Sequence, residues 1–172
     1  MATGITISKP SGNTGGVGAG TAVTGNTSNN VGANLVIPGN TLNPDAAQTT
    51  LEIRGRGFKT GTAGNCTMRM FFNTAPDLTG TPVLLATHTS SAANIHAQFV
   101  RQVYIDKTYT IVLNATQNAN TDDTENAAGR TRITNAGNID YTANLYLVLA
   151  IQNGSAADST SPTLWYTKTH GY

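Results

Sequence analysis

Alternation of apolar and polar residues is the main pattern in this chain, and it recurs from residue 34 onward. In residues 51–57, Leu, Ile and two Gly share one face of the pattern, while Glu and two Arg share the other. In residues 66–72, Cys, two Met and Phe alternate with Thr, Arg and Phe in the same way. A period of two is typical of half-buried strands. It predicts nine strands: Leu35–Ile37, Thr49–Phe58, Cys66–Asn73, Pro82–Thr89, Ile95–Ile105, Tyr109–Thr116, Thr131–Thr134, Ala143–Gln152 and Thr163–Thr169.

The strand predicted at residues 143–152 is apolar on both of its faces. Leu and Ile occupy the odd positions from 145 to 151, and Tyr146, Val148 and Ala150 lie opposite them. We therefore expect this strand to be covered on both sides. Turns rich in Gly, Pro and Asn separate the strands, and no helix pattern interrupts them. The predicted fold class is all-β, an antiparallel β-sandwich or jelly roll of about eight strands with an extended N-terminal arm.

The first 33 residues differ in composition from the rest, because they are rich in Gly, Thr and Asn and show no apolar period. Such a segment is typical of a flexible linker when nothing holds it. We predict two parts, an extended arm over residues 1–33 and a β-sandwich domain over residues 34–172. The alternative is that the N-terminal segment packs on its own domain.

Five apolar residues stand out within the predicted arm: Ile5, Ile7, Val17, Val23 and Val31. They are too few to form a core, so ordering the arm requires another surface to offset its conformational entropy. We expect them to anchor the arm on neighbouring copies of this chain or on another protein. Deletion of residues 1–32 is then expected to leave a folded body that has lost its attachment.

Charge is scarce in this chain, because only 11% of its residues are Asp, Glu, Lys or Arg and the net charge is +1. No overall field is present to hold nucleic acid or an anionic membrane. A lone cysteine excludes an intrachain disulfide framework. We also expect neither a membrane span nor a signal peptide, because no apolar run reaches ~20 residues and the first residues lack a leader pattern.

Candidate chemical groups are few. His88 ends one predicted strand and His96 begins the next, but no acidic or Cys residue stands at ligand spacing, so we expect exposed polar residues and no metal. Residues 122–125, Asp-Asp-Thr-Glu, lack the turn glycine of a calcium loop. Cys66 alternates with two Met, which predicts a small buried residue without a partner base. We predict no enzyme, no catalytic residue and no cofactor.

A basic group is also present, consisting of Arg54, Arg56, Lys59 and Arg69. With the nearby Phe71 it resembles the basic and aromatic surface of a single-strand binder. Few aromatic residues accompany it and the chain is nearly neutral. We therefore expect a face that meets solvent or another subunit.

Four segments carry a resemblance to a known family. Residues 36–42 read Val-Ile-Pro-Gly-Asn-Thr-Leu, and residues 51–54 read Leu-Glu-Ile-Arg. Thr-Met-Arg-Met-Phe-Phe follows at residues 67–72, and Leu-Tyr-Leu-Val-Leu at residues 145–149 precedes a polar turn. On these segments, over about residues 34–172, the chain resembles the small jelly-roll virion proteins of tailed bacteriophages. The resemblance implies a capsid decoration or cement protein, a head fibre or a tail-fibre tip, commonly a homotrimer.

The first hypothesis is therefore a structural virion protein, assembled in the host cytoplasm and placed on the capsid surface. It binds and stabilises the phage head through its N-terminal arm, with further copies of itself and the major capsid protein or another virion protein as partners. Tyr146, Trp165 and Tyr166 are the candidate interface aromatics, and ordinary core packing is the alternative for them. The second hypothesis is a head- or tail-fibre tip that binds host-surface glycan through Trp165 and polar loops.

Overall fold

The described part of this chain contains twelve strands, joined by turns and loops, and no helix. The computed structural model describes residues 5–8, 14–25, 28–42, 49–90, 93–105, 110–114, 131–134, 140 and 142–170. In those ranges, accordingly, no helix is long and apolar enough to cross a membrane. The strands are β1 Ile5–Ser8, β2 Thr14–Ala19, β3 Val23–Thr24, β4 Asn30–Ile37, β5 Thr49–Thr60, β6 Cys66–Asn73, β7 Val83–Ser90, β8 Ile95–Ile105, β9 Thr110–Asn114, β10 Thr131–Thr134, β11 Leu145–Asn153 and β12 Ser159–His170.

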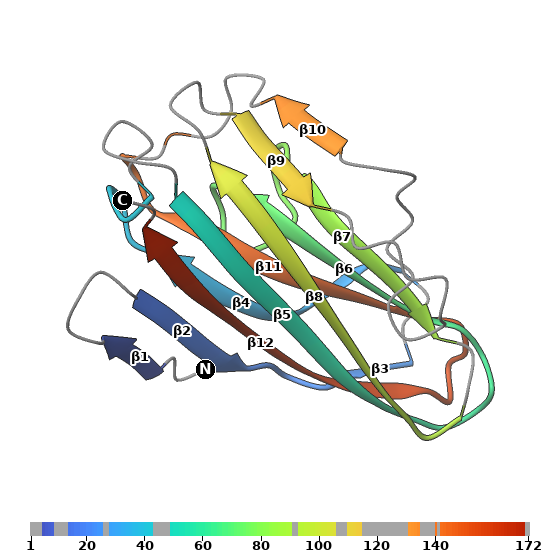
Figure 1. Cartoon of the computed structure of the whole chain (residues 1–172). Helices are drawn as coiled ribbons and strands as arrows, with labels where there is room; N and C mark the ends of the chain where they lie inside the picture. The colour runs from blue at the N-terminus through green and yellow to red at the C-terminus, as the bar shows by residue number, and fades with distance from the viewer. Residues whose placement is uncertain are drawn as a thin grey trace.

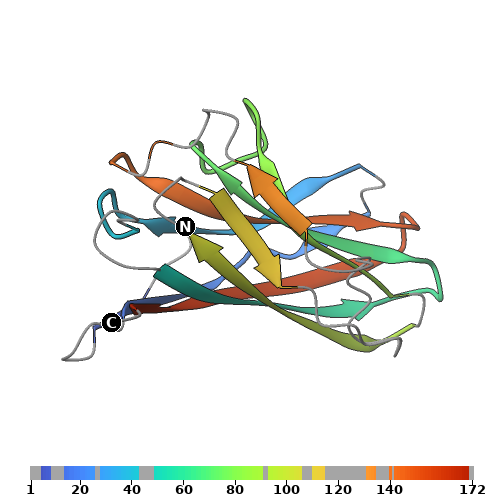
Figure 2. The same cartoon turned by 45° about the horizontal axis from the view of Figure 1, so that its top comes forward.

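The strands form two antiparallel sheets that pack face to face as a sandwich (Figure 1). The large sheet has the order β1-β2-β12-β5-β8-β9-β10, with β3 also paired to β12, and the small sheet has the order β4-β11-β6-β7. Figure 2 shows the two sheets as separate layers. Within them, β2-β12-β5-β8 faces β4-β11-β6-β7, which is the strand order of an eight-stranded jelly roll. The predicted all-β sandwich is confirmed.

The alternating pattern places the core between the sheets. All nine strands predicted from that pattern are present, as β4 to β12. On β5, Leu51 and Ile53 are fully buried, and on β11 the odd-numbered residues from 145 to 151 are buried as well. On the opposite face of β11, Val148 and Ala150 also have no exposed surface. The prediction that this strand is covered on both sides is therefore confirmed.

The N-terminal segment lies along the last strand. β2 pairs with residues 163–168 of β12, and β3 pairs with residues 159–160. Because β5 pairs with the other side of β12, that strand has a neighbour on each side. This position matches the alternative that the N-terminal segment packs on its own domain. The boundary predicted between residues 33 and 34 falls inside β4, and the division into an arm and a domain stays a prediction.

Two glycines allow this segment to cross the body closely. The Gly20 amide donates a hydrogen bond to the carbonyl oxygen of Pro162, over 3.0 Å. A Cβ atom on Gly20 would lie 2.0 Å from the Gly32 carbonyl oxygen and 2.6 Å from Pro162 Cγ, which leaves no room for any side chain. Pro162 has no amide hydrogen, so the pairing along β12 is interrupted there, between β2 and β3.

Candidate functional site

The outer face of the small sheet carries apolar side chains. Val36 pairs with Tyr146 across β4 and β11, and Phe71 pairs with Leu84 across β6 and β7. Val148 is opposite Phe71 in the register and so lies between these pairs. Val36 is 47% exposed and Leu84 is 44% exposed, while Phe71 and Tyr146 are half-buried. We call these five residues the apolar face.

The loop between β6 and β7 reaches over part of this face. Asn34 donates a hydrogen bond from Nδ2 to the carbonyl oxygen of Pro76, over 3.1 Å. Asn34 and Phe71 are the register neighbours of Val148 on either side, and Val148 has no exposed surface. The centre of the apolar face is therefore covered by the protein itself, and its rim is open.

Hydrogen bonds give this loop a fixed shape. Asn73 donates from Nδ2 to the carbonyl oxygens of Asp77 and Thr79, over 2.7 and 2.9 Å. Asp77 Oδ1 accepts hydrogen bonds from the hydroxyl of Thr79, over 2.5 Å, and from its amide, over 2.9 Å. These bonds, led by the hydroxyl of Thr79, hold the pKa of the Asp77 carboxyl below its usual value.

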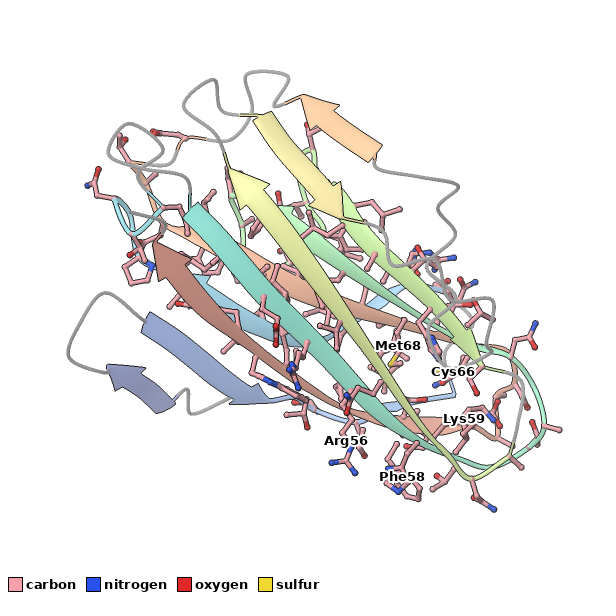
Figure 3. The ribbon with its side chains drawn as sticks, in the orientation of Figure 1. Arg56, Phe58, Lys59, Cys66 and Met68 are labelled. Carbon is pink, nitrogen blue, oxygen red and sulfur yellow. The ribbon has the colours of Figure 1, made fainter. Side chains whose placement is uncertain are left out.

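The outer face of the large sheet differs, because it combines aromatic rings with cations. The rings of Phe58 and His96 stack with their centroids 4.4 Å apart, and Phe58 is 38% exposed. Arg56 Nη2 lies 3.2 Å from His96 Nδ1, within hydrogen-bond distance. Trp165 is half-buried and stands opposite Arg54 in the register of β12 and β5. We call these five residues the aromatic–cation face; Figure 3 shows Arg56 and Phe58 on the far side of β5 from Met68.

The predicted group of four basic residues is not a single patch. Arg54 and Arg56 share the aromatic–cation face, and Arg54 pairs with Glu52 of its own strand, Nη2 to Oε1, over 2.6 Å. Lys59 lies on the inward face of β5 and is only 2% exposed. Arg69 belongs to β6 in the other sheet, where Nη1 donates to the side chain of Gln152. The prediction was wrong because an odd-numbered residue of β5 points into the sandwich.

His88 and His96 lie in different environments. His88 is 2% exposed and pairs with Met68 across β7 and β6, so the expectation that it is an exposed polar residue is wrong. His96 is exposed on the aromatic–cation face, as expected. The acidic residues 122–125 lie outside the described residues. In the part of the chain that the structure describes, no group of three or more His, Cys, Asp or Glu is placed to hold a metal ion.

A buried polar cluster lies at one end of the sandwich, where Figure 3 places Lys59 and Cys66. Lys59 Nζ is 3.3 Å from Asp158 Oδ2, and these side chains are 2% and 0% exposed. Lys59 also donates a hydrogen bond to the carbonyl oxygen of Thr62. Asp158 Oδ1 accepts hydrogen bonds from the amide and the hydroxyl of Thr62, over 2.6 and 2.8 Å.

Asn153 and Thr160 extend this cluster toward the N-terminal segment. Thr160 donates a hydrogen bond from Oγ1 to Asn153 Oδ1, over 2.8 Å, and Asn153 Nδ2 donates to the carbonyl oxygen of Val23, over 2.9 Å. Cys66 Sγ is 3.3 Å from Thr160 Oγ1. The cluster therefore links β3, β5, β6, β11 and β12. We call the following six residues the end cluster: Lys59, Thr62, Cys66, Asn153, Asp158 and Thr160.

The pKa values of the two ionisable acids of the end cluster, Asp158 and Cys66, shift in opposite directions although burial raises both. Burial raises the pKa of Asp158, but hydrogen bonds from Thr62 and the Lys59 ammonium outweigh it, so this pKa lies below its usual value. Burial raises the pKa of the Cys66 thiol, and the hydrogen bond with Thr160 offsets only part of that effect. Asp158 is therefore a carboxylate and Cys66 a neutral thiol at neutral pH. The expectation that Cys66 is a small buried residue is confirmed, since it is 3% exposed.

The structure separates the three predicted interface aromatics. Tyr146 lies on the apolar face and Trp165 lies on the aromatic–cation face, on opposite sides of the sandwich. Tyr166 is 4% exposed and belongs to the core, which is the core-packing alternative. Of these three aromatic residues, Tyr146 and Trp165 therefore lie on outer faces and Tyr166 does not.

The five predicted arm anchors belong to four strands, β1 to β4. Val23 is 8% exposed and packs in the core. Val31 is half-buried on β4. The backbones of Ile5, Ile7 and Val17 lie in β1 and β2, where Ile5 pairs with Val17, and their side chains lie outside the described part of the structure.

Sequence reasoning missed several residues of these surfaces. The alternating pattern predicts the strands that contain Val36, Phe71 and Leu84, but it does not predict that these residues share a face. A single sequence carries no signal for which strands pair across the small sheet. The sequence also does not predict the contact between Lys59 and Asp158. The odd position of Lys59 along β5 does indicate that its side chain is buried.

No family model matches the chain, and no curated protein matches it. Similar solved structures include the CBM2 module of the evolved Dit of Lactobacillus casei BL23 phage J-1, with a TM-score of 0.41 and 8% identity over 91% of this chain and 78% of that chain. The legume lectin-like domain from Entamoeba histolytica has a TM-score of 0.34 and 9% identity, over 96% of this chain and 84% of that chain. A chain of the empty virus-like particle of Cowpea Mosaic Virus has a TM-score of 0.29 and 11% identity, over 73% of this chain and 53% of that chain.

Proposed function

We propose that this chain is a structural virion protein of the capsid decoration or cement type, which binds the major capsid protein on the outside of a phage head. The apolar face is the observation that carries this proposal. The sequence resemblance to small jelly-roll virion proteins gives the class of partner, and no catalytic or cofactor role is part of the proposal.

The apolar face is suited to contact with protein. Val36 and Leu84 expose nearly half of their surface on one side of the sheet, with Phe71 and Tyr146 beside them. These exposed side chains lie on the two edge strands of the small sheet, on either side of the covered centre at Val148. Exposed apolar side chains grouped on one face commonly mark interaction sites, and interface centres are poor in charge and rich in aromatic residues. We therefore place the capsid contact on this face, with Tyr146 as its aromatic residue.

The N-terminal segment has a narrower role in this proposal than the sequence suggested. A deletion of residues 1–32 would also remove β2 and β3, which pair with β12. A deletion of residues 1–13 removes β1 alone and leaves β2 in place. In the proposal, β1 is an edge strand that adds contacts to a neighbouring copy or to the shell, since open edges accept further strands.

Binding to purified heads of the phage that encodes this chain tests the proposal. Val36→Lys with Leu84→Lys places two charges on the apolar face, and we expect binding, measured by co-sedimentation, to fall at least tenfold. Phe58→Lys on the opposite outer face is the matched control and is expected to bind normally. Unchanged binding by the double variant would exclude the apolar face as the capsid contact.

The second candidate function is glycan recognition by a fibre tip, and the aromatic–cation face favours it. Phe58 and Trp165 offer ring surface, and Arg56 and His96 offer polar groups beside it. Binding sites for small polar ligands combine apolar rings with a few polar groups. Glycan-array binding that is lost in Phe58→Ala and Trp165→Ala, but kept in the apolar-face variant, would support this function over the first.

A further inference from the structure

Lys59 and Asp158 form a buried ion pair between two neighbouring strands of the large sheet. Nζ and Oδ2 are 3.3 Å apart, and the two side chains are 2% and 0% exposed. Lys59 is close to the end of β5, and Asp158 comes directly before β12. The register pairs Lys59 with Thr160 and Thr60 with Ser159, so the amine and the carboxylate meet where the two strands run side by side.

The two oxygens of the Asp158 carboxylate have different partners. Oδ1 accepts hydrogen bonds from the amide and the hydroxyl of Thr62, over 2.6 and 2.8 Å. Oδ2 faces the Lys59 ammonium at 3.3 Å, and no other donor among the described protein atoms bonds to it. Two donors aimed at one oxygen stabilise negative charge that develops there when a nucleophile attacks the carbonyl carbon. Oδ2 is then the oxygen that leaves, as water, when the tetrahedral intermediate collapses.

The backbone around Asp158 keeps this arrangement fixed. Gly25 donates its amide hydrogen to the Asp158 carbonyl oxygen, over 2.8 Å. Gly61 has a φ of 115°, and a Cβ atom on it would lie 2.6 Å from Asp158 Oδ1, so the turn after β5 closes directly on the carboxylate. Holding two reacting groups in one orientation removes most of the entropic barrier to a reaction between them.

Burial also favours a neutral product over the ion pair. Removing an ammonium and a carboxylate from water carries a desolvation penalty for each charge, and their attraction offsets it only in part. An amide between the same two side chains has no net charge and keeps the link between the strands. Condensation therefore removes both buried charges and releases one water molecule to the solvent.

We propose that Lys59 and Asp158 condense to an intramolecular isopeptide bond that joins β5 to β12. The ammonium passes one proton to Oδ2, and the neutral amine then attacks Cγ, forming the N–C bond with the negative charge on Oδ1 at the Thr62 donors. A second proton moves from the nitrogen to Oδ2, the Cγ–Oδ2 bond breaks, and water leaves. Ammonium and carboxylate give amide and water, so atoms and charges balance without an oxidant or another reactant.

Intact-mass measurement of the full-length protein, denatured after incubation in the folded state at neutral pH, tests the bond. We expect a mass lower than the sequence mass by one water molecule. A tryptic digest is then expected to contain a branched peptide in which residues 57–69 are joined to residues 133–168 through Lys59 and Asp158. A wild-type protein that keeps its full sequence mass after prolonged incubation would overturn the proposal.

Two variants distinguish water lost through this isopeptide bond from water lost through another reaction. In Asp158→Asn the same amide would form with release of ammonia, so this variant is expected to reach the same final mass as the wild type. Lys59→Arg cannot form the bond and is expected to keep its full mass. A water loss that persists in Lys59→Arg would come from a succinimide at Asp158 and would overturn the proposal, and the branched wild-type peptide decides the matter even where a variant fails to fold.

Discussion

Gly20 approaches Gly32 so closely that a Cβ atom on Gly20 would lie 2.0 Å from the Gly32 carbonyl oxygen. The obstructing atom belongs to the backbone, so the main chain itself must move to admit a methyl group. We expect Gly20→Ala to lower the free energy of unfolding by about 3 kcal/mol, as overpacking does elsewhere. Urea unfolding measures this change. Ala22→Ser, at an exposed position two residues away, is the control; equal stability of the two variants would show that the close approach is absent.

Asn153 connects the N-terminal segment to the end cluster, and its removal takes one hydrogen-bond partner from each of two buried groups. The carbonyl oxygen of Val23 loses its donor, and the hydroxyl of Thr160 loses its acceptor. A buried group left unsatisfied costs about 1–3 kcal/mol, and the Thr160 hydroxyl keeps only the weaker partner Cys66 Sγ. We therefore expect Asn153→Ala to lower the thermal midpoint clearly in calorimetry. Asn65→Ala, at an exposed position, is expected to change it little, and a similar effect in both variants would contradict this account.

The Cys66 thiol is expected to resist alkylation in the native protein. Burial raises its pKa, and the thiolate is the reactive form, so both access and reactivity are low. Iodoacetamide labelling followed by mass spectrometry measures this, with protein in urea as the fully reactive control. Complete labelling of the folded protein within minutes at pH 8 would contradict the burial of this residue.

The buried phenol of Tyr166 is expected to make the free energy of unfolding depend on pH in the alkaline range. Burial raises the pKa of its phenol, so the folded state holds the proton in a range where the unfolded state has released it. The stability of the folded state is therefore undiminished below the unfolded pKa of about 10 and falls as pH rises above it. Urea unfolding at a series of pH values measures the slope. We expect a smaller slope for Tyr166→Phe, and an identical slope would contradict the assignment.

The sheets and their inward faces were predictable from the sequence, because β-strand alternation is a local pattern. Leu51, Ile53 and the odd positions of β11 carry that pattern, and each is buried as the alternation requires. The covering of β11 on both sides was predictable for the same reason. What the pattern lacks is the partner of each strand, so the apolar face, which is made by pairing across four strands, had no local signal.

Residues 14–24 show what composition alone leaves open about the N-terminal segment. Glycine is typical of flexible linkers, but it is also the residue that lets two backbones approach closely. Gly20 and Gly32 serve the second purpose, and nothing in their sequence surroundings distinguishes it from the first. The end cluster was missed for a related reason. Lys59 and Asp158 are far apart in sequence, and only the pairing of β5 with β12 brings them together.

The place of β12 in the large sheet has a consequence for synthesis. β12 is made after every other described strand, yet it lies between β2 and β5, which do not pair with each other. On the ribosome, a nascent chain therefore holds two unjoined halves of this sheet until residues 159–170 have emerged. A translation stop before that point leaves two long strand edges open, and truncated products are expected to aggregate rather than persist as a smaller domain.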